Sequence, residues 1–335
     1  MDLSTINLSD FVRNAEILWL KGASTFNPVA RNSGMVREVV IPQNSGNSRE
    51  FSEIDLELYA RIKGERDESK YGKIQQGYSK TGTLYRISLS EAITYEMRTQ
   101  GKYLDVQQRL LNLLPTAMRR MELDLQHRIT FATSTSYTDQ DGRSVDIAVG
   151  DTLALASTAH TVRGSSTTFR NRLANSPQLS RGALESMEKM RVENNINQFG
   201  QKVAVNDDIL FTTDDPNTVN TARELLQSTA SVTSGANAGV TNVYTAKYKH
   251  VILPLVATDK DGAVDTTKAK YWGLASSMRS AFYLGVHEEA HVVSPEEVAG
   301  KNALTDDWIF GVRAGYMIVV PAAAWFSISL GDGTA

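Results

Sequence analysis

A five-residue run in the last third of the chain has the spacing of a catalytic metal site. His287, Glu288 and His291 match HExxH, a pattern in which two histidines bind zinc and the glutamate acts as a general base. The pattern requires a helix, because residues i and i+4 then share a face. Here polar and apolar residues alternate from Phe282 to Val292, which is typical of a strand.

On a strand these two histidines would be too far apart for one metal ion. Residues i and i+4 of a strand lie about 13 Å apart, whereas each zinc ligand lies about 2 Å from the metal. Ser294 stands where the extended zinc motif has glycine, and residues 295–298 contain no third histidine. We therefore predict two surface histidines on a strand. A zinc metalloprotease that uses His287, Glu288 and His291 is the alternative function from another class.

Other catalytic patterns are absent from the sequence. The chain has no cysteine and lacks the GxSxG, GxxxxGK[ST] and GxGxxG patterns that carry nucleophilic serines and phosphate-binding loops. We interpret His160 as a hydrogen-bonded structural residue, and Asp207, Asp208, Asp214 and Asp215 as turn and cap residues. The sequence thus predicts no enzymatic activity, no metal site and no cofactor.

Length and composition describe a globular protein. The 335 residues are 41% hydrophobic and 22% charged, and the net charge is −3. Such a charge gives no general attraction for nucleic acid or for an anionic membrane. No apolar run approaches 18 residues and the N-terminus lacks the pattern of a signal peptide, so we predict no membrane association.

The longest helical signal runs from Tyr103 to about Thr133. Apolar residues recur there at spacings of three and four, which predicts one buried stripe on a helix about 45 Å long. Pro115 lies inside this helix and predicts a bend near residues 111–114 rather than a break. The stripe consists of Leu111, Leu114, Met118, Met121, Leu125 and Ile129, with Arg119, Arg120, Glu122, Asp124 and Arg128 expected on the flanks and back.

A long β-hairpin is predicted before this helix. Polar and apolar residues alternate strictly from Ile54 to Lys63, and a second alternating run from Tyr85 to Leu89 returns toward the helix. The segment from Gly64 to Gly82 between them is rich in charged and small residues, so we expect an exposed tip. A lone hairpin is marginally stable in water, so this one must lie against its own domain or another chain.

Residues 1–32 are predicted to form an arm with one short helix, capped by Ser9 and ended by Gly22. About twelve residues of helix cannot stand alone in water. The apolar face of this helix includes Phe11 and Trp19. It must dock on this subunit or on a neighbour.

The remaining pattern predicts a mixed α+β fold with an inserted domain. Helices are expected from Leu179 to Asn194, capped by Ser180, and after Asp215, and residues 228–241 are expected to form an exposed loop. Because the long helix precedes this region and the last strands follow it, residues from about 180 to 300 are predicted to be inserted into a discontinuous domain. The expected strands are 251–256, 271–275, 282–293, 308–312 and 316–330.

This order of parts, together with several sequence blocks, resembles the tailed-phage major capsid protein of the HK97 fold. The resemblance covers about residues 33 to 330 and concerns the fold rather than any chemistry. The blocks are Leu155–His160 with Gly164, Asn171 and Asn175; Leu179–Glu185; the run through Val205 and Leu210 to Thr221–Leu226; Ile87–Glu96; and Trp308–Ile328.

The resemblance implies an α+β, HK97-like capsid fold with a long spine helix and an extended β-hairpin, the E-loop. It implies a structural protein that assembles as pentamers and hexamers into an icosahedral shell around double-stranded DNA. An encapsulin-like compartment shares the fold and is the alternative shell function. The implied parts are the N-terminal arm at 1–32, the extended loop at 33–85, the peripheral domain at 86–180 and 301–335, and the axial domain at 181–300.

The implied partners are further copies of the chain, with scaffolding, portal and decoration proteins. The implied location is the virion capsid, and the host cytoplasm during assembly. Two hypotheses about assembly follow. The arm helix clamps through Phe11 and Trp19, and the hairpin tip contacts a neighbour through Arg61, Lys63, Arg66, Lys70 and Lys73.

Overall fold

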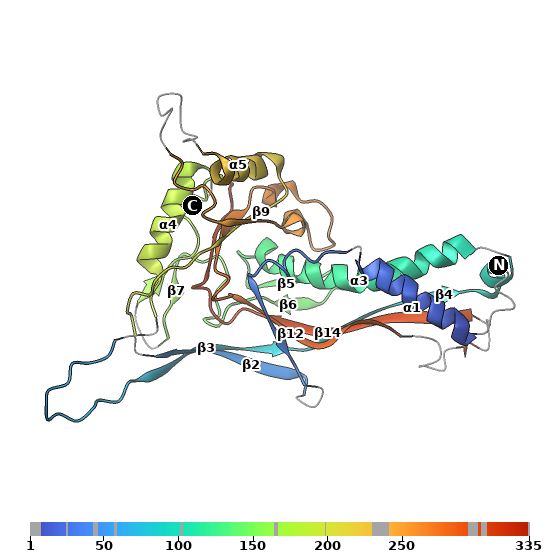
Figure 1. The fold of residues 1–335 in the computed structure, drawn as a ribbon, viewed down its shortest axis with the longest axis horizontal. Helices are drawn as coiled ribbons and strands as arrows, with labels where there is room; N and C mark the ends of the chain where they lie inside the picture. The colour runs from blue at the N-terminus through green and yellow to red at the C-terminus, as the bar shows by residue number, and fades with distance from the viewer. Residues whose placement is uncertain are drawn as a thin grey trace.

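A long helix and a long sheet form one limb of this mixed α+β protein (Figure 1). Helix α3 (Tyr103–Thr130) confirms the predicted long helix and runs unbroken through Pro115. It packs on a five-stranded sheet in which β14 (Asp307–Val319) pairs with β12 (Phe282–Val293) and with β4 (Tyr85–Ile93). The other elements of the limb are α1 (Leu8–Ser24), α2 (Tyr95–Thr99), β1 (Val36–Val40), which is parallel to β12, and β13 (Lys301–Asn302).

The computed structural model describes residues 8–24, 26–42, 46–56, 59–100, 103–163, 167–197, 199–229, 241–293, 301–302 and 307–333. The exposed loop predicted at 228–241 lies almost wholly outside these residues. Within them, no helix combines the length and the apolar composition needed to cross a bilayer.

A second, four-stranded sheet and two helices form a lobe at the other end of the limb (Figure 1). Helix α4 (Arg181–Asn194) is capped by the Ser180 hydroxyl, and α5 (Pro216–Gln227) by the Asp215 carboxylate, as the sequence predicted. Their apolar faces pack with Leu210 and Trp272 in one buried cluster. The strands, in sheet order, are β10 (Lys249–Ile252), β9 (Ile209–Thr212), β11 (Trp272–Ala275) and β15 (Phe326–Ser329).

The strand pairings cross the predicted division of the chain at residue 300. β12 belongs to the stretch 181–300 but pairs with β1 and β14 in the limb. β15 belongs to the stretch 301–335 but pairs with β11 in the lobe. Two closing strands were expected at 308–312 and 316–330. The structure instead has one continuous strand, β14, in which Ala314 and Gly315 pair with β4, followed by the separate strand β15.

The hairpin exists, but its strands differ from the predicted ones. β2 (Ser48–Leu56) pairs with β3 (Ile74–Thr83), and the residues predicted as the return strand belong to β4 and pair with β14. The alternation after Tyr85 therefore reflects packing of β4 against the core of the limb.

The smaller elements are the strand pairs β5 (Ser136–Thr138) with β6 (Ser144–Asp146) and β7 (His160–Thr161) with β8 (Thr168–Phe169), and the 3-10 turns η3 (Pro254–Ala257) and η4 (Thr266–Lys268).

The polar residues expected on the flanks and back of α3 are largely buried. Glu122, Asp124 and Arg128 are each 3% exposed, because residues 121–130 of α3 are buried apart from the half-buried Leu123, whereas Arg119 is exposed. The Asp124 carboxylate accepts hydrogen bonds from the hydroxyls of Tyr85 (3.3 Å) and Tyr316 (2.6 Å). The sequence pattern predicted one buried stripe, whereas the tertiary structure also covers the back of the helix.

Other buried polar groups of α3 bond to the backbone of surrounding segments. The Glu122 carboxylate accepts from the Ala30 N–H, and the Gln126 side-chain oxygen accepts from the Leu255 N–H at 2.7 Å. A buried peptide group without such a partner would cost free energy. These side chains therefore fix the segment before β1 and the turn η3 on α3.

Gly22 and Pro115 allow α1 and α3 to approach closely. Pro115 has no N–H, so the Leu111 carbonyl lacks its helical partner. A Cβ atom at Gly22 would lie 2.1 Å from that carbonyl oxygen. Gly22 was predicted to end the arm helix, but α1 continues to Ser24, and the glycine serves the contact between helices.

We predict that Gly22→Ala lowers the free energy of unfolding by about 1–3 kcal/mol, because the added methyl group pushes α1 away from α3. Gly182→Ala in α4 is the matched control, since nothing lies within 4 Å of its Cβ position. Helix propensity alone would stabilise both variants by up to about 1 kcal/mol. Urea unfolding of the unassembled subunit measures the difference, and a stabilised Gly22→Ala variant would contradict the close packing.

We predict that buried His127 lowers the free energy of unfolding in acid. Burial first, and then the positive charge of Lys268, lower the pKa of His127 from 6.5 to about 4. The folded state therefore keeps the ring neutral where the unfolded chain binds a proton, so stability falls as the pH drops from about 6.5 toward 4. Between pH 7 and pH 5 this residue accounts for a loss of about 2 kcal/mol.

The measurement is urea unfolding of the unassembled subunit at pH 7 and pH 5. His127→Gln should lose about 2 kcal/mol less than the wild type over this interval. Equal losses in wild type and His127→Gln would show that His127 is not the group responsible.

Candidate assembly surface

The loop between β2 and β3 extends away from the rest of the chain (Figure 1). Every described side chain from 59 to 73 is exposed, and none of these residues belongs to a strand. Large apolar and aromatic side chains are among them, with Ile62 99% and Tyr71 96% exposed. Together with Tyr59 and Ile74, which are 63% and 70% exposed, they form an apolar surface that the described part of this chain does not cover.

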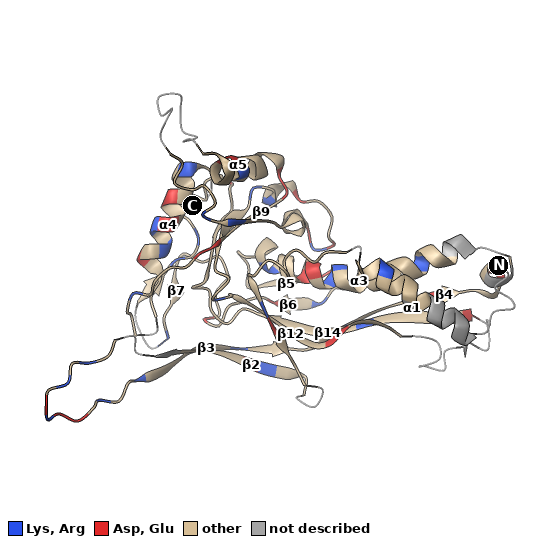
Figure 2. Cartoon of the chain, in the orientation of Figure 1, with Lys and Arg blue, Asp and Glu red and all other residues tan. Residues whose placement is uncertain are grey.

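Most charged residues of the tip predicted at 64–82 lie on this loop, but residues 74–82 belong to β3, so Lys80 lies on that strand. Figure 2 shows basic residues along both sides of the loop and acidic residues at its end. The Asp67 carboxylate accepts a hydrogen bond from the Gly64 N–H at 3.1 Å and closes the turn. Contact of the five basic residues with a neighbour stays a prediction. These residues are Arg61, Lys63, Arg66, Lys70 and Lys73.

The base of the hairpin is held firmly on the body of the chain. Arg163 donates to the Gly77 carbonyl at 2.7 Å, and the Tyr78 hydroxyl lies 2.7 Å from that of Thr161. A Cβ atom at Gly82 would lie 2.4 Å from a methyl group of Val319, so β3 crosses β14 at close range. The hairpin is therefore fixed at its base and uncovered at its tip.

The arm helix docks on its own chain through Trp19. The indole is 5% exposed, and its ring centroid lies 5.9 Å from that of Phe310 on β14. The side chain of Phe11 lies outside the described residues. Ile17 and Leu20 on the same helix are 63% and 70% exposed, so they present the apolar surface that is available to a neighbour.

The HExxH residues lie on strand β12, which confirms the predicted strand. The register of β12 against β14 shifts twice, between Val286 and Glu288 and between Glu288 and His291. These bulges interrupt the alternation of faces. His291 is 45% exposed and its Nε2 atom lies 3.5 Å from Glu288, while Glu289 forms an ion pair with Arg31. Across the described residues, no three His, Asp or Glu side chains gather in a way that could hold a metal ion.

His160 is the buried, hydrogen-bonded residue that the sequence predicted. Its Nδ1 atom lies 2.7 Å from the Asp151 carboxylate and its Nε2 atom 3.2 Å from the Leu155 carbonyl. Burial alone would raise the pKa of Asp151, but its hydrogen bond to His160 and the charge of that ring leave this pKa below its ordinary value. The side chain is fully buried, so the pair stabilises the loop before β7 and offers no accessible nucleophile.

Comparison with known proteins finds similar solved structures at low sequence identity. No protein-family model matches the sequence, and no curated protein sequence is similar to it. A solved chain from Gordonia phage Cozz is 11% identical, with a TM-score of 0.49 over 88% of this chain and 84% of that chain.

Two further similar structures are described as capsids. The capsid of an empty GTA particle is 9% identical, with a TM-score of 0.46 over 90% of this chain and 89% of that chain. The capsid of Myoviridae phage XM1 is 14% identical, with a TM-score of 0.42 over 90% of each chain.

Proposed function

We propose that this chain is a major capsid protein of a tailed phage, a structural protein of the HK97 fold that assembles as pentamers and hexamers into an icosahedral shell. The observation that carries the proposal is the loop of residues 59–73. A projecting loop with almost fully exposed Ile62 and Tyr71 needs a surface outside its own subunit. Neighbouring copies of the chain supply that surface.

The charge of the chain is compatible with enclosing double-stranded DNA. A shell around densely packed DNA must be able to release the DNA, so it should not bind the DNA phosphates tightly. Proteins that bind DNA tightly neutralise these phosphates with Lys and Arg. The net charge of −3 provides no general attraction of this kind. The DNA would therefore be enclosed without sequence-specific binding.

The capsid proposal also assigns roles to the parts of the fold. The limb with α3 as spine helix corresponds to the peripheral domain, and the lobe with α4 and α5 to the axial domain. The hairpin β2–β3 corresponds to the E-loop and α1 to the N-terminal arm. Because β12 and β15 cross the division at residue 300, we place the boundary between the two sheets rather than at one position in the chain.

The first experiment is the particle size of the purified protein, by sedimentation and electron microscopy. Shells, or rings of about 184 to 221 kDa from five or six copies of the 36.8 kDa chain, would support the proposal. DNA and portal proteins that co-purify with shells would distinguish a phage capsid from an encapsulin-like compartment with enzyme cargo. A monomer that carries one zinc per chain would contradict it.

We predict that replacing residues 57–73 with Asn-Gly prevents shell formation and leaves a folded subunit. Leu56 and Ile74 are directly paired, so a two-residue type I′ turn can join them without disturbing the hairpin. Electron microscopy should find no shells, while circular dichroism and the melting temperature of the subunit should stay close to the wild type. Normal shells from this variant would refute the role of the loop.

A single substitution tests the same surface more gently. Ile62→Asn should weaken assembly, because the loop would bury a polar group against its neighbour. Val264→Asn is the matched control, since Val264 is an 85% exposed aliphatic residue outside the hairpin. Equal assembly of the two variants, measured by light scattering at a series of concentrations, would place the contact elsewhere.

We predict that the two faces of α1 respond differently to substitution. Trp19→Ala should destabilise the unassembled subunit by about 3–5 kcal/mol, because the indole is part of its own core. Leu20→Asn should change subunit stability by about 0.5 kcal/mol or less but lower the melting temperature of assembled particles. Particles of Leu20→Asn that melt with the wild type would rule out this face of the arm as a contact.

A further inference from the structure

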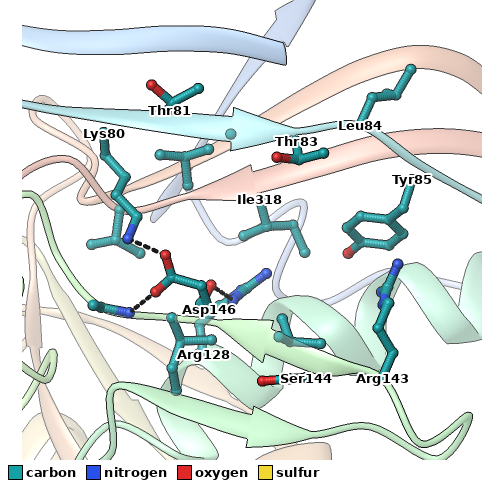
Figure 3. Close-up of a pocket in the computed structure, with 16 residues that line it drawn as sticks. Lys80, Thr81, Thr83, Leu84, Tyr85, Arg128, Arg143, Ser144, Asp146 and Ile318 are labelled. Atoms are coloured by element: carbon teal, nitrogen blue, oxygen red, sulfur yellow. Dashed lines mark hydrogen bonds and ion pairs between the residues drawn. The ribbon is translucent and has the colours of Figure 1, made fainter. Parts of the chain in front are cut away.

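A pocket lies between the base of the hairpin and the body of the chain (Figure 3). Its volume is about 300 Å³, and its walls come from β3 and the start of β4, from α3, from β6 with the residues beside it, and from the end of β14. Three of its lining residues are cationic, Lys80, Arg128 and Arg143, and one is anionic, Asp146. The lining thus has a formal charge of +2, in a chain whose net charge is −3.

Arg128 is the buried member of this set. Its side chain is 3% exposed, and one Nη atom donates to the backbone carbonyl of Asp146 at 3.0 Å. Its Nε atom is buried and has no hydrogen-bond partner. Among the described residues no carboxylate lies within ion-pair distance of this guanidinium. A buried charge without a counter-charge is unfavourable, so a compensating anion would stabilise the site.

Among the described lining residues, the one carboxylate belongs to Asp146, which forms its ion pair with Lys80 and not with Arg128. Asp146 accepts hydrogen bonds from the Lys80 ammonium group and from the Ala148 N–H, and its side chain is 64% exposed (Figure 3). Arg143 lies on the opposite side, with its guanidinium 4.3 Å from the centre of the Tyr85 ring. It also forms an ion pair of 3.4 Å with Asp139. The side chain of Arg143 is 45% exposed and can turn toward a ligand.

We propose that this pocket binds a small dianionic oxyanion of the phosphate class. A guanidinium and an ammonium group are the side chains that best bind phosphate oxygens, through charge-assisted hydrogen bonds. Thr83 and Ser144 line the same pocket, and hydroxyl groups can donate hydrogen bonds to further oxygens. A phosphate carries a charge of about −1.5 to −2 at pH 7, which matches the formal charge of the lining.

Binding would connect the hairpin to the spine helix. Lys80 lies on β3, Arg128 on α3 and Arg143 next to β6. One anion held by all three joins the base of the projecting hairpin to the two elements beneath it. The site rests on these side chains alone and does not depend on the capsid proposal.

The test is isothermal titration of the full chain with inorganic phosphate, at constant ionic strength maintained with chloride. We expect saturable binding to the wild type, a rise in melting temperature over the same concentrations, and an affinity at least tenfold lower for Lys80→Gln and for Arg143→Gln. Arg223→Gln is the matched control, because Arg223 is exposed on α5, outside the pocket, and should bind as the wild type does.

Arg128→Gln should abolish phosphate binding, but this substitution is at a buried position. If the Arg128→Gln variant does not fold, Lys80→Gln and Arg143→Gln test the proposal. Absence of saturable heat from the wild type would overturn the proposal. Unchanged affinity in the double variant Lys80→Gln, Arg143→Gln would overturn it as well. Acetate that bound as tightly as phosphate would overturn the assignment to a dianionic oxyanion.

Discussion

The hydrogen bonds of buried Asp124 hold the limb of this protein together. Its carboxylate, on α3, accepts from hydroxyls on two strands of the long sheet, Tyr85 of β4 and Tyr316 of β14, and from Arg120 one turn earlier. Burial raises the pKa of both tyrosines well above the ordinary value, as does the nearby carboxylate, so both phenols stay protonated and donate. The helix, the sheet and the β5–β6 pair, which Arg120 reaches through Asp139, are thereby fixed relative to one another.

That rigid limb explains how the chain can display surfaces that would be unstable alone. Two-stranded hairpins and short amphipathic helices are marginal in water unless they pack against something. The base of the hairpin packs on β14 through Phe51, Met317 and Val319, and α1 packs on the limb through Trp19. Ile62 and Tyr71 on the loop stay exposed in the described part of the chain. If the chain assembles as we propose, neighbouring copies would cover them and assembly would be coupled to the ordering of the loop.

The pocket at the base of the hairpin lies where the fixed and projecting parts meet. Arg128 is buried there because the back of α3 is covered, and within the described part of the chain its guanidinium donates to a single acceptor, the backbone carbonyl of Asp146. An anion at this position would contact the base of the hairpin and the elements beneath it, and not the tip of the hairpin. The proposed capsid function and the proposed oxyanion site thus concern different residues of the same hairpin, and each can stand without the other.

Local pattern was sufficient for the helices and for the class of the fold. The periodicity from Tyr103, the cap at Ser180 and the cap at Asp215 predicted α3, α4 and α5, because the periodicity of a helix and its N-terminal cap depend on residues close in sequence. The alternation around His287 likewise predicted β12 and argued against a zinc-binding helix. The loop of the hairpin was also visible as a charged segment.

Tertiary structure alone decided which strands pair and which polar groups are buried. β4 pairs with β14 rather than with β2. β12 lies in the sheet of the limb and β15 in the sheet of the lobe, each on the other side of the predicted division at residue 300. These pairings could not be predicted, because partners distant in sequence leave no local signal. Gly22 looked like a helix stop, but its place against the Leu111 carbonyl follows from the packing of two helices. Arg128 looked like a solvated flank of α3. Only the covering of that flank by the β5–β6 pair and β14 turned it into a buried cation.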